Sequence, residues 1–216
     1  MRFDAVLFDC DGVLVDSEPI THGVLRDMLR ELGWELSSAE CMRLFVGKSL
    51  KDEVVMIAQH TGRPVADDWI ERFQQRRNAA LRERLTAIPN VHATVRELHA
   101  RHAGNIACAS GADRIKVELQ LRQVGLMDYF DGRIFSGYET PRSKPFPDVY
   151  LAAAEGLRAQ PRRCAVVEDT VIGVSAGVAA GTLVFGYAPD GDGAALRAAG
   201  AARIFSDMAQ LPMLLT

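Results

Sequence analysis

The sequence predicts an α/β fold in which a Rossmann-like parallel sheet, with helices on both faces, carries an inserted α-helical bundle. Short apolar runs rich in β-branched residues recur along the chain, and in its second half they alternate with helical patterns. A long helical stretch without strand patterns separates the first apolar run from the second. Strands that alternate with helices predict a parallel sheet, because neighbouring parallel strands need a crossover connection.

We expect buried strands at the apolar runs, since a sheet covered on both faces has strands that are apolar throughout. These runs cover residues 5–8, 105–109, 165–167, 182–185 and 202–205. Helical patterns accompany them at residues 91–101, 114–124, 147–157 and 173–180, and Gly125 and Gly181 end two of these patterns. Residues 1–16 and 87–216 are therefore predicted to form the α/β core domain.

Residues 17–86 are predicted to form a small helical bundle, a cap domain, because this interval is far too long for one crossover helix. Ser37 and Glu40 have the spacing of a capping box at the start of a helix. Apolar residues at helical spacing mark the helices: Ile20, Val24, Leu25, Met28, Leu29 and Leu32, then Leu50, Val54, Ile57 and Ala58, then Trp69, Ile70, Phe73 and Leu81.

Composition favours a protein that acts on small molecules. Lys and Arg number 25 against 28 Asp and Glu, so the net charge of −3 gives no basic footprint for nucleic acid or anionic lipid. The 4 cysteines are scattered without a paired spacing, which predicts buried, reduced thiols. The first apolar run, residues 5–8, is too short for a signal peptide or a membrane span. We therefore expect a cytoplasmic protein.

Two aspartates follow the first apolar run with a single residue between them. In the stretch AVLFDCDGVLVD, Asp9 and Asp11 come just as the strand ends, and the side-chain period of two predicts that they project to the same side of the chain. Like charges this close repel each other, so the pair predicts a compensating partner. A shared proton, a bound cation, or a nearby lysine or arginine would each serve.

Other polar residues lie where later strands are predicted to end, at the sheet edge where ligands of parallel α/β folds collect. The segment RSKPFPD contains a single lysine, Lys144, and its prolines restrict the backbone around it. The positive charge of Lys144 would compensate the negative charge of the acids. Taken singly, each residue has a structural interpretation as a helix cap or a surface charge. Together they indicate one site. They are Asp9, Asp11, Ser110, Gly111, Lys144, Glu168 and Asp169.

These segments resemble the motifs of a known family. FDCDGVLVDSE is similar to the first motif of haloacid dehalogenase superfamily phosphatases, the serine of CASG to the second, the lysine of SKPFPD to the third and VVEDT to the fourth. The resemblance covers nearly the whole chain and is to helical-cap members of the β-phosphoglucomutase and phosphoglycolate phosphatase type. The phrase FSGYETPRSKPFPD is similar to the branch that contains 6-phosphogluconate phosphatase.

The resemblance implies a Mg²⁺-dependent phosphatase that hydrolyses a small phosphorylated metabolite, a sugar phosphate or sugar-acid phosphate such as 6-phosphogluconate. Asp9 is implied to be the nucleophile that forms an aspartyl phosphate, and Asp11 the general acid and base. The magnesium is implied to bind Asp9, Asp169 and the Asp11 backbone carbonyl, with Glu168 in or near the coordination shell.

The phosphate is implied to be bound by Ser110, Gly111 and Lys144. In the cap, Lys48 and either Arg76 or Arg77 could reach an anionic tail of the substrate, although a solvated surface position is an equally good interpretation. We expect no nucleic-acid or membrane partner, and a monomer or weak homodimer.

Two alternative functions stay open. One is a phosphomutase like β-phosphoglucomutase, which uses a cap histidine to assist its second acid. Thr21 stands at the matching position here, with His22 one place later, which counts against a mutase. The other alternative is a binding protein that senses a phosphorylated metabolite without catalysis.

Overall fold

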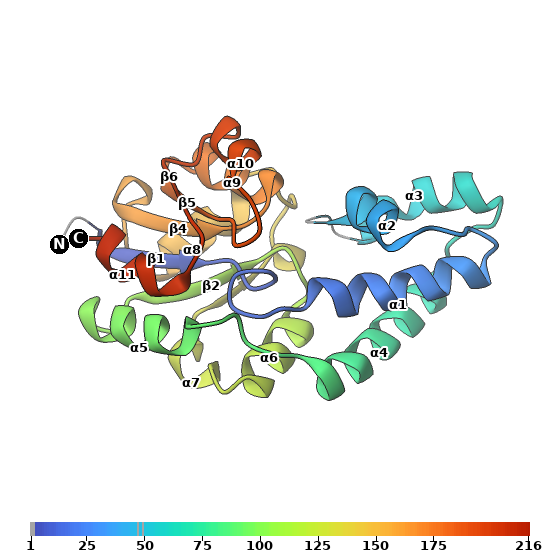
Figure 1. Ribbon diagram of the computed structural model, residues 1–216, viewed down its shortest axis with the longest axis horizontal. Helices are drawn as coiled ribbons and strands as arrows, with labels where there is room; N and C mark the ends of the chain where they lie inside the picture. Colours follow the sequence, from blue (N-terminus) through green and yellow to red (C-terminus); the bar gives the residue numbers. More distant parts are fainter. Residues whose placement is uncertain (1–2, 47, 49) are drawn as a thin grey trace.

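A six-stranded, fully parallel sheet with the strand order β3-β2-β1-β4-β5-β6 forms the centre of the protein (Figure 1). The computed structural model describes residues 3–46, 48 and 50–216. The predicted α/β fold is confirmed. The strands are β1 (Ala5–Phe8), β2 (Ile106–Ser110), β3 (Ile134–Ser136), β4 (Cys164–Glu168), β5 (Leu183–Tyr187) and β6 (Arg203–Phe205).

Each predicted strand is present, with ends that differ by at most two residues. The edge strand β3 was not predicted from the sequence. It has only 3 residues, Ile-Phe-Ser, which give too little apolar pattern to distinguish a strand from a loop. It pairs with β2 from Cys108↔Ile134 to Ser110↔Ser136, which extends the sheet beyond β2.

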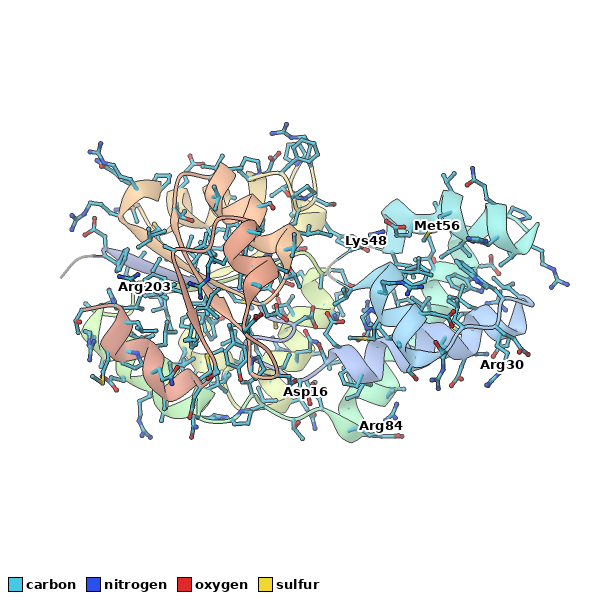
Figure 2. The ribbon with its side chains drawn as sticks, turned by 45° about the horizontal axis from the view of Figure 1, so that its top comes forward. Asp16, Arg30, Lys48, Met56, Arg84 and Arg203 are labelled. Atoms are coloured by element: carbon cyan, nitrogen blue, oxygen red, sulfur yellow. The ribbon has the colours of Figure 1, made fainter. Side chains whose placement is uncertain are left out.

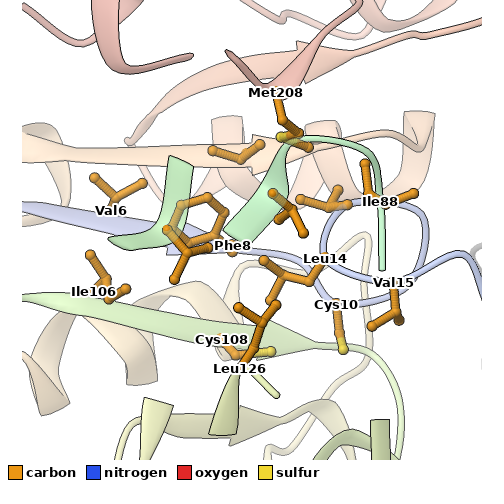
Figure 3. Close-up of a cluster of buried hydrophobic side chains, with 14 of the residues drawn as sticks. Val6, Phe8, Cys10, Leu14, Val15, Ile88, Ile106, Cys108, Leu126 and Met208 are labelled. Carbon is orange, nitrogen blue, oxygen red and sulfur yellow. The ribbon is translucent and has the colours of Figure 1, made fainter. Parts of the chain in front are cut away.

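Helices cover both faces of the sheet, as the fully buried central strands β1, β2 and β4 require. Val6 and Phe8 of β1 point to one face, where α5, α6, α7 and α11 pack, and Ala5 and Leu7 point to the other, beneath α8, α9 and α10 (Figures 1 and 3). The four helices predicted for this part of the chain are confirmed, and their ends differ from the predicted ones by at most two residues. The helices are α5 (Val91–Arg101), α6 (Arg114–Gln123), α7 (Met127–Phe130), α8 (Asp148–Gly156), α9 (Val171–Ala179), α10 (Ala194–Ala198) and α11 (Leu211–Leu214), with 3-10 turns η1 (Gly137–Glu139), η2 (Pro161–Arg163) and η3 (Met208–Gln210).

The segment between β1 and α5 is helical and lies beside the sheet rather than on either of its faces (Figure 1). The predicted capping box is confirmed, since Glu40 N–H donates to Ser37 Oγ at 3.2 Å and Ser37 N–H donates to Glu40 Oε2 at 2.9 Å. Its helices enclose an apolar cluster of their own that includes Met28, Leu29 and Trp69. They are α1 (Glu18–Glu31), α2 (Ser38–Phe45), α3 (Leu50–Thr61) and α4 (Asp67–Arg84).

The chain enters and leaves this bundle through two connections that lie side by side. Asp16 N–H donates to Thr86 O at 2.9 Å, and Val15 forms an antiparallel bridge with Ala87. Figure 2 shows Asp16 and Arg84 close to this junction, whereas Arg30 lies toward the far end of the bundle. The two connections therefore fix where the bundle begins and ends in space.

Two further predictions concern the whole chain. All four cysteines, Cys10, Cys41, Cys108 and Cys164, are free and buried, as predicted. Within the described residues, none of the helices combines the length and the apolar composition needed to cross a membrane.

Candidate active site

The polar residues predicted to form a site converge at the carboxyl edge of the three central strands. β1 lies between β2 and β4, and Phe8 is level with Cys108 on one side and with Val167 on the other. The residues that follow these strand positions, from Asp9, Ser110 and Glu168 onward, are thereby brought to one place. The parallel sheet is what positions the site.

Lys144 lies at the centre of this cluster. Its Nζ lies 2.7 Å from Asp9 Oδ1, 2.7 Å from Glu168 Oε1, 2.9 Å from the Tyr150 hydroxyl and 3.2 Å from Ala109 O. Burial alone lowers the pKa of Lys144, but the adjacent Asp9 and Glu168 carboxylates raise it well above its usual value. Lys144 is therefore a permanent positive charge shared by two acids.

Asp9 is buried directly after β1, where its N–H donates to Val167 O at 3.0 Å. Burial raises the pKa of Asp9 to about 7, and Lys144 opposes this rise only in part. The ionised carboxylate therefore depends on positive charge around it. A carboxylate in this state has an oxygen to offer to a cation or to an electrophile.

Asp11 has a different environment, although only one residue separates it from Asp9. Lys116 Nζ lies 2.8 Å from both carboxylate oxygens, Gln120 Nε2 donates to Oδ1 at 2.8 Å, and Ser17 Oγ donates to Oδ1 as well. Burial on its own raises the pKa of Asp11, but Lys116 and the other donors outweigh it and lower that pKa to about 2. The two acids thus have separate ammonium partners.

The end of β4 supplies two more carboxylates. Glu168 accepts hydrogen bonds at both carboxylate oxygens. Its Oε1 accepts from Lys144 Nζ and from the Tyr150 hydroxyl, each at 2.7 Å. Its Oε2 accepts from Thr170 Oγ1 at 3.1 Å and from the backbone N–H groups of Asp169 and Thr170. A Cβ on Gly173 would lie 1.8 Å from Glu168 Oε1, so glycine is needed there. Glu168 is therefore held firmly by its surroundings.

Carboxylate oxygens of Asp9, Glu168 and Asp169 lie within 4.8 Å of one another. Asp169 Oδ1 is buried and has no hydrogen-bond partner among the described residues. Burial and the neighbouring Glu168 and Asp9 charges raise the pKa of Asp169 well above its usual value. An orphaned buried oxygen within an all-oxygen donor set fits a hard divalent cation such as Mg²⁺. Asp9 and Asp169 would hold the ion, with Glu168 beside it.

Ser110 ends β2 and is buried. Its Oγ accepts a hydrogen bond from the Ala112 N–H at 3.0 Å, which leaves the hydroxyl hydrogen for an acceptor in the cavity. A Cβ on Gly137 would lie 3.3 Å from Gly111 Cα, so the turn after Ser110 packs closely on the segment after β3. This packing fixes the turn.

One cavity joins these residues to the helical bundle. Its walls include Asp9, Asp11, Ser110, Gly111, Lys144 and Glu168 from the sheet side, and Thr21, His22, Lys48, Phe73 and Arg77 from the bundle. The structure therefore brings the predicted phosphate-binding residues and two of the bundle cations to one cavity.

The bundle residues have partners within the protein. Arg77 Nη2 donates to Asp113 Oδ2 at 3.0 Å, while the Lys48 side chain is 36 % exposed and its Nζ lies 3.4 Å from Glu53 Oε1. Figure 2 shows Lys48 where the bundle faces the α/β part of the protein. Arg76 instead pairs with Glu31, with Nη1 at 2.5 Å from Oε1, and is not among the lining residues. Of the two neighbouring arginines, only Arg77 lines the cavity.

Sequence reasoning missed Lys116, Gln120 and Tyr150. Lys116 and Gln120 lie four residues apart in the predicted helix 114–124, beside the apolar residues Val117 and Leu121. A lysine and a glutamine next to an apolar stripe are a weak signal of polar residues that face inward. Nothing in the local sequence indicates that Tyr150 contacts Glu168.

Residues 3–181 of the chain match the family of haloacid dehalogenase-like hydrolases. The chain belongs to this family. This hydrolase is 30 % identical over 190 residues to the 6-phosphogluconate phosphatase of Escherichia coli K12, a match that covers 88 % of this chain and 84 % of the relative. The predicted family resemblance and the assignment as a hydrolase of the phosphatase type are confirmed.

Solved structures of related proteins share the fold. A HAD family hydrolase from Deinococcus radiodurans R1, determined with bound phosphate and sodium, is 37 % identical with a TM-score of 0.76, and the match covers 99 % of this chain and 95 % of the other. A putative beta-phosphoglucomutase from Thermotoga maritima is 26 % identical with a TM-score of 0.76, over 98 % of this chain and 97 % of the other.

The contact between Gly12 and Asp169 gives a first prediction. Gly12 has a φ of +75°, and a Cβ there would lie 2.0 Å from Asp169 Oδ2. We expect Gly12→Ala to displace the Asp169 carboxylate and to weaken Mg²⁺ binding by about 10-fold or more, measured by titration calorimetry. Gly23→Ala is the control, because no atom of the residues that the structure describes lies within 4 Å of a Cβ at Gly23. Unchanged Mg²⁺ affinity in Gly12→Ala would exclude Asp169 as a ligand.

The raised pKa of Asp9 gives a second prediction. Between the ordinary pKa of 3.8 and the folded-state pKa of about 7, the folded protein keeps a proton that the unfolded chain releases, so the free energy of unfolding decreases as pH rises. In chelator, Asp9→Asn should therefore gain stability relative to the wild type from pH 4 to pH 8, measured by urea denaturation. A difference between the two proteins that does not vary with pH would contradict the assignment.

Proposed function

We propose that this hydrolase is a Mg²⁺-dependent phosphatase that cleaves a sugar phosphate or a sugar-acid phosphate, such as 6-phosphogluconate, through an aspartyl phosphate. The observation that carries the proposal is the placement of Asp9 in the cavity, 2.7 Å from Lys144 and within 4.8 Å of the Asp169 and Glu168 carboxylates. The 30 % sequence identity to the Escherichia coli 6-phosphogluconate phosphatase supports a sugar-acid phosphate as the substrate.

In the proposed first step, a carboxylate oxygen of Asp9 bonds to phosphorus as the ester P–O bond breaks. Lys144 pairs with Asp9 and offsets the repulsion between its charge and the phosphate. The Ser110 hydroxyl donates to a phosphate oxygen. Bound Mg²⁺ would supply further positive charge to the phosphoryl group.

Proton transfer is assigned to Asp11. It protonates the leaving oxygen in the first step and removes a proton from the water that hydrolyses the aspartyl phosphate in the second. Asp9 cannot perform this transfer, because it carries the phosphoryl group at that stage. Burial raises the pKa of Asp11, but Lys116 and the other donors lower it to about 2, so Asp11 is ionised in the free protein. The first step therefore requires that the negative charge of the bound phosphate raise this pKa and bring a proton to Asp11.

We further propose that residues 17–86 act as a cap domain on a core of residues 1–16 and 87–216. The separate apolar cluster of α1–α4 and the adjacent connections at Asp16 and Thr86 support this division. Lys48 and Arg77 are the proposed contacts for the part of the substrate beyond the phosphate. The cap thereby sets which metabolite enters.

The nucleophile assignment predicts that Asp9→Asn reduces phosphate release by about 1,000-fold or more, because the amide cannot form the acyl phosphate. Release is measured with Mg²⁺ present, and chelator should stop the wild-type reaction. Asp68→Asn is the matched control, since the Asp68 side chain is 71 % exposed on the bundle. Normal turnover by Asp9→Asn would refute the nucleophile.

The substrate class is tested with a panel of sugar phosphates and sugar-acid phosphates, ranked by kcat/KM. We expect free phosphate as the product and the highest kcat/KM for a sugar-acid phosphate, since Lys48 and Arg77 bring cations to the cavity wall. The likeness to a putative beta-phosphoglucomutase supports a competing function as a phosphomutase. A phosphomutase would form a bisphosphate intermediate and release little free phosphate. A bisphosphate intermediate with little free phosphate would overturn the phosphatase proposal in favour of a phosphomutase.

A further inference from the structure

Lys116 and Gln120 are buried polar residues that the reaction outlined above does not use. They lie four residues apart on α6, so both project from the same side of the helix. Lys116 is 6 % exposed and Gln120 0 %. A buried ammonium and a buried amide are costly unless each has a polar partner. Both residues have the same one, the carboxylate of Asp11.

The contacts determine how Asp11 is oriented. Lys116 Nζ lies 2.8 Å from each carboxylate oxygen, and Gln120 Nε2 lies 2.8 Å from Oδ1. Contact with both oxygens fixes the plane of the carboxylate as well as its position. The helix that carries these donors packs on the sheet through Val117 and Leu121, so the donors belong to a rigid part of the protein.

A third residue orients Gln120. The Cys10 thiol donates to Gln120 Oε1 at 3.4 Å, so the amide nitrogen is the end that faces Asp11. With the opposite amide orientation, the amide oxygen would face the carboxylate and repel it. Cys10 lies between the two aspartates in the sequence and projects into the buried apolar cluster together with Cys108 (Figure 3). It thus contributes to the orientation of Asp11 through the Gln120 amide.

We propose that Lys116 and Gln120 are positioning residues that hold the Asp11 carboxylate in the orientation needed for proton transfer, with Cys10 fixing the Gln120 amide. The inference rests on the proposed phosphatase function. A proton moves efficiently only when the acid lies within hydrogen-bond reach of the leaving oxygen, so a carboxylate free to rotate transfers it more slowly. Lys144 acts on Asp9 instead, which makes the two lysines functionally distinct.

The test compares two leaving groups in single-turnover experiments with Lys116→Met. An alkyl phosphate such as 6-phosphogluconate needs a proton on the leaving oxygen, whereas the nitrophenolate of p-nitrophenyl phosphate leaves without one. We expect cleavage of the alkyl ester to slow by about 10- to 100-fold with little change in KM, and release of nitrophenolate to stay within about threefold of the wild type. Lys116→Arg should restore part of the alkyl-ester rate.

Two further variants complete the experiment. Gln120→Leu should show the same dependence on the leaving group with a smaller loss, and it keeps the test open if Lys116→Met fails to fold. Arg122→Met is the matched control, because Arg122 lies on the same helix, is 63 % exposed and pairs with Glu118. It should leave both esters unaffected.

Equal losses for both esters, or a rise in KM at unchanged kcat, would overturn the positioning role. Wild-type rates in Lys116→Met and Gln120→Leu would do the same, while leaving the phosphatase proposal intact. A wild-type protein that cleaves neither ester in the presence of Mg²⁺ would instead remove the proposed function. The two failures are therefore distinguishable.

Discussion

The site depends on the separate neutralisation of two aspartates, one buried and one partly buried, that only one residue separates in the chain. Asp9 is paired with Lys144, which comes from the loop before α8, and Asp11 is paired with Lys116, which comes from α6. A single lysine between the acids would leave them in one shared environment. Each lysine lowers the pKa of its own aspartate, but burial outweighs Lys144 at Asp9, whose pKa is raised, whereas Lys116 and the other donors outweigh burial at Asp11, whose pKa is lowered.

The strand order makes this arrangement possible. Because β1 lies between β2 and β4, the residues after it meet Ser110 on one side and Glu168 on the other without any long excursion of the chain. Lys116 comes from α6, which packs on one face of the sheet, and Lys144 comes from the loop before α8, which packs on the other face. The chemistry is thus a consequence of where the central strand lies.

Residues at strand ends were predictable from the sequence, whereas Lys116, Gln120 and Tyr150, which lie on helices, were not. Asp9, Ser110 and Glu168 follow apolar runs, and the parallel sheet obliges such positions to meet. Tyr150 and Gln120 lie within helices, where a polar residue is assigned to the surface unless the tertiary partner is known. The edge strand β3 was missed for a related reason, because its pairing with β2 rather than its own 3 residues makes it a strand.

The adjacent connections at Asp16 and Thr86 bear on how such enzymes diversify. Since the two chain connections of the bundle lie side by side, joined by the hydrogen bond from Asp16 N–H to Thr86 O and by the bridge between Val15 and Ala87, a segment of different length or shape can be exchanged there without disturbing the order of the strands. The polar edge of the sheet and the bundle wall of the cavity can therefore change independently over evolution.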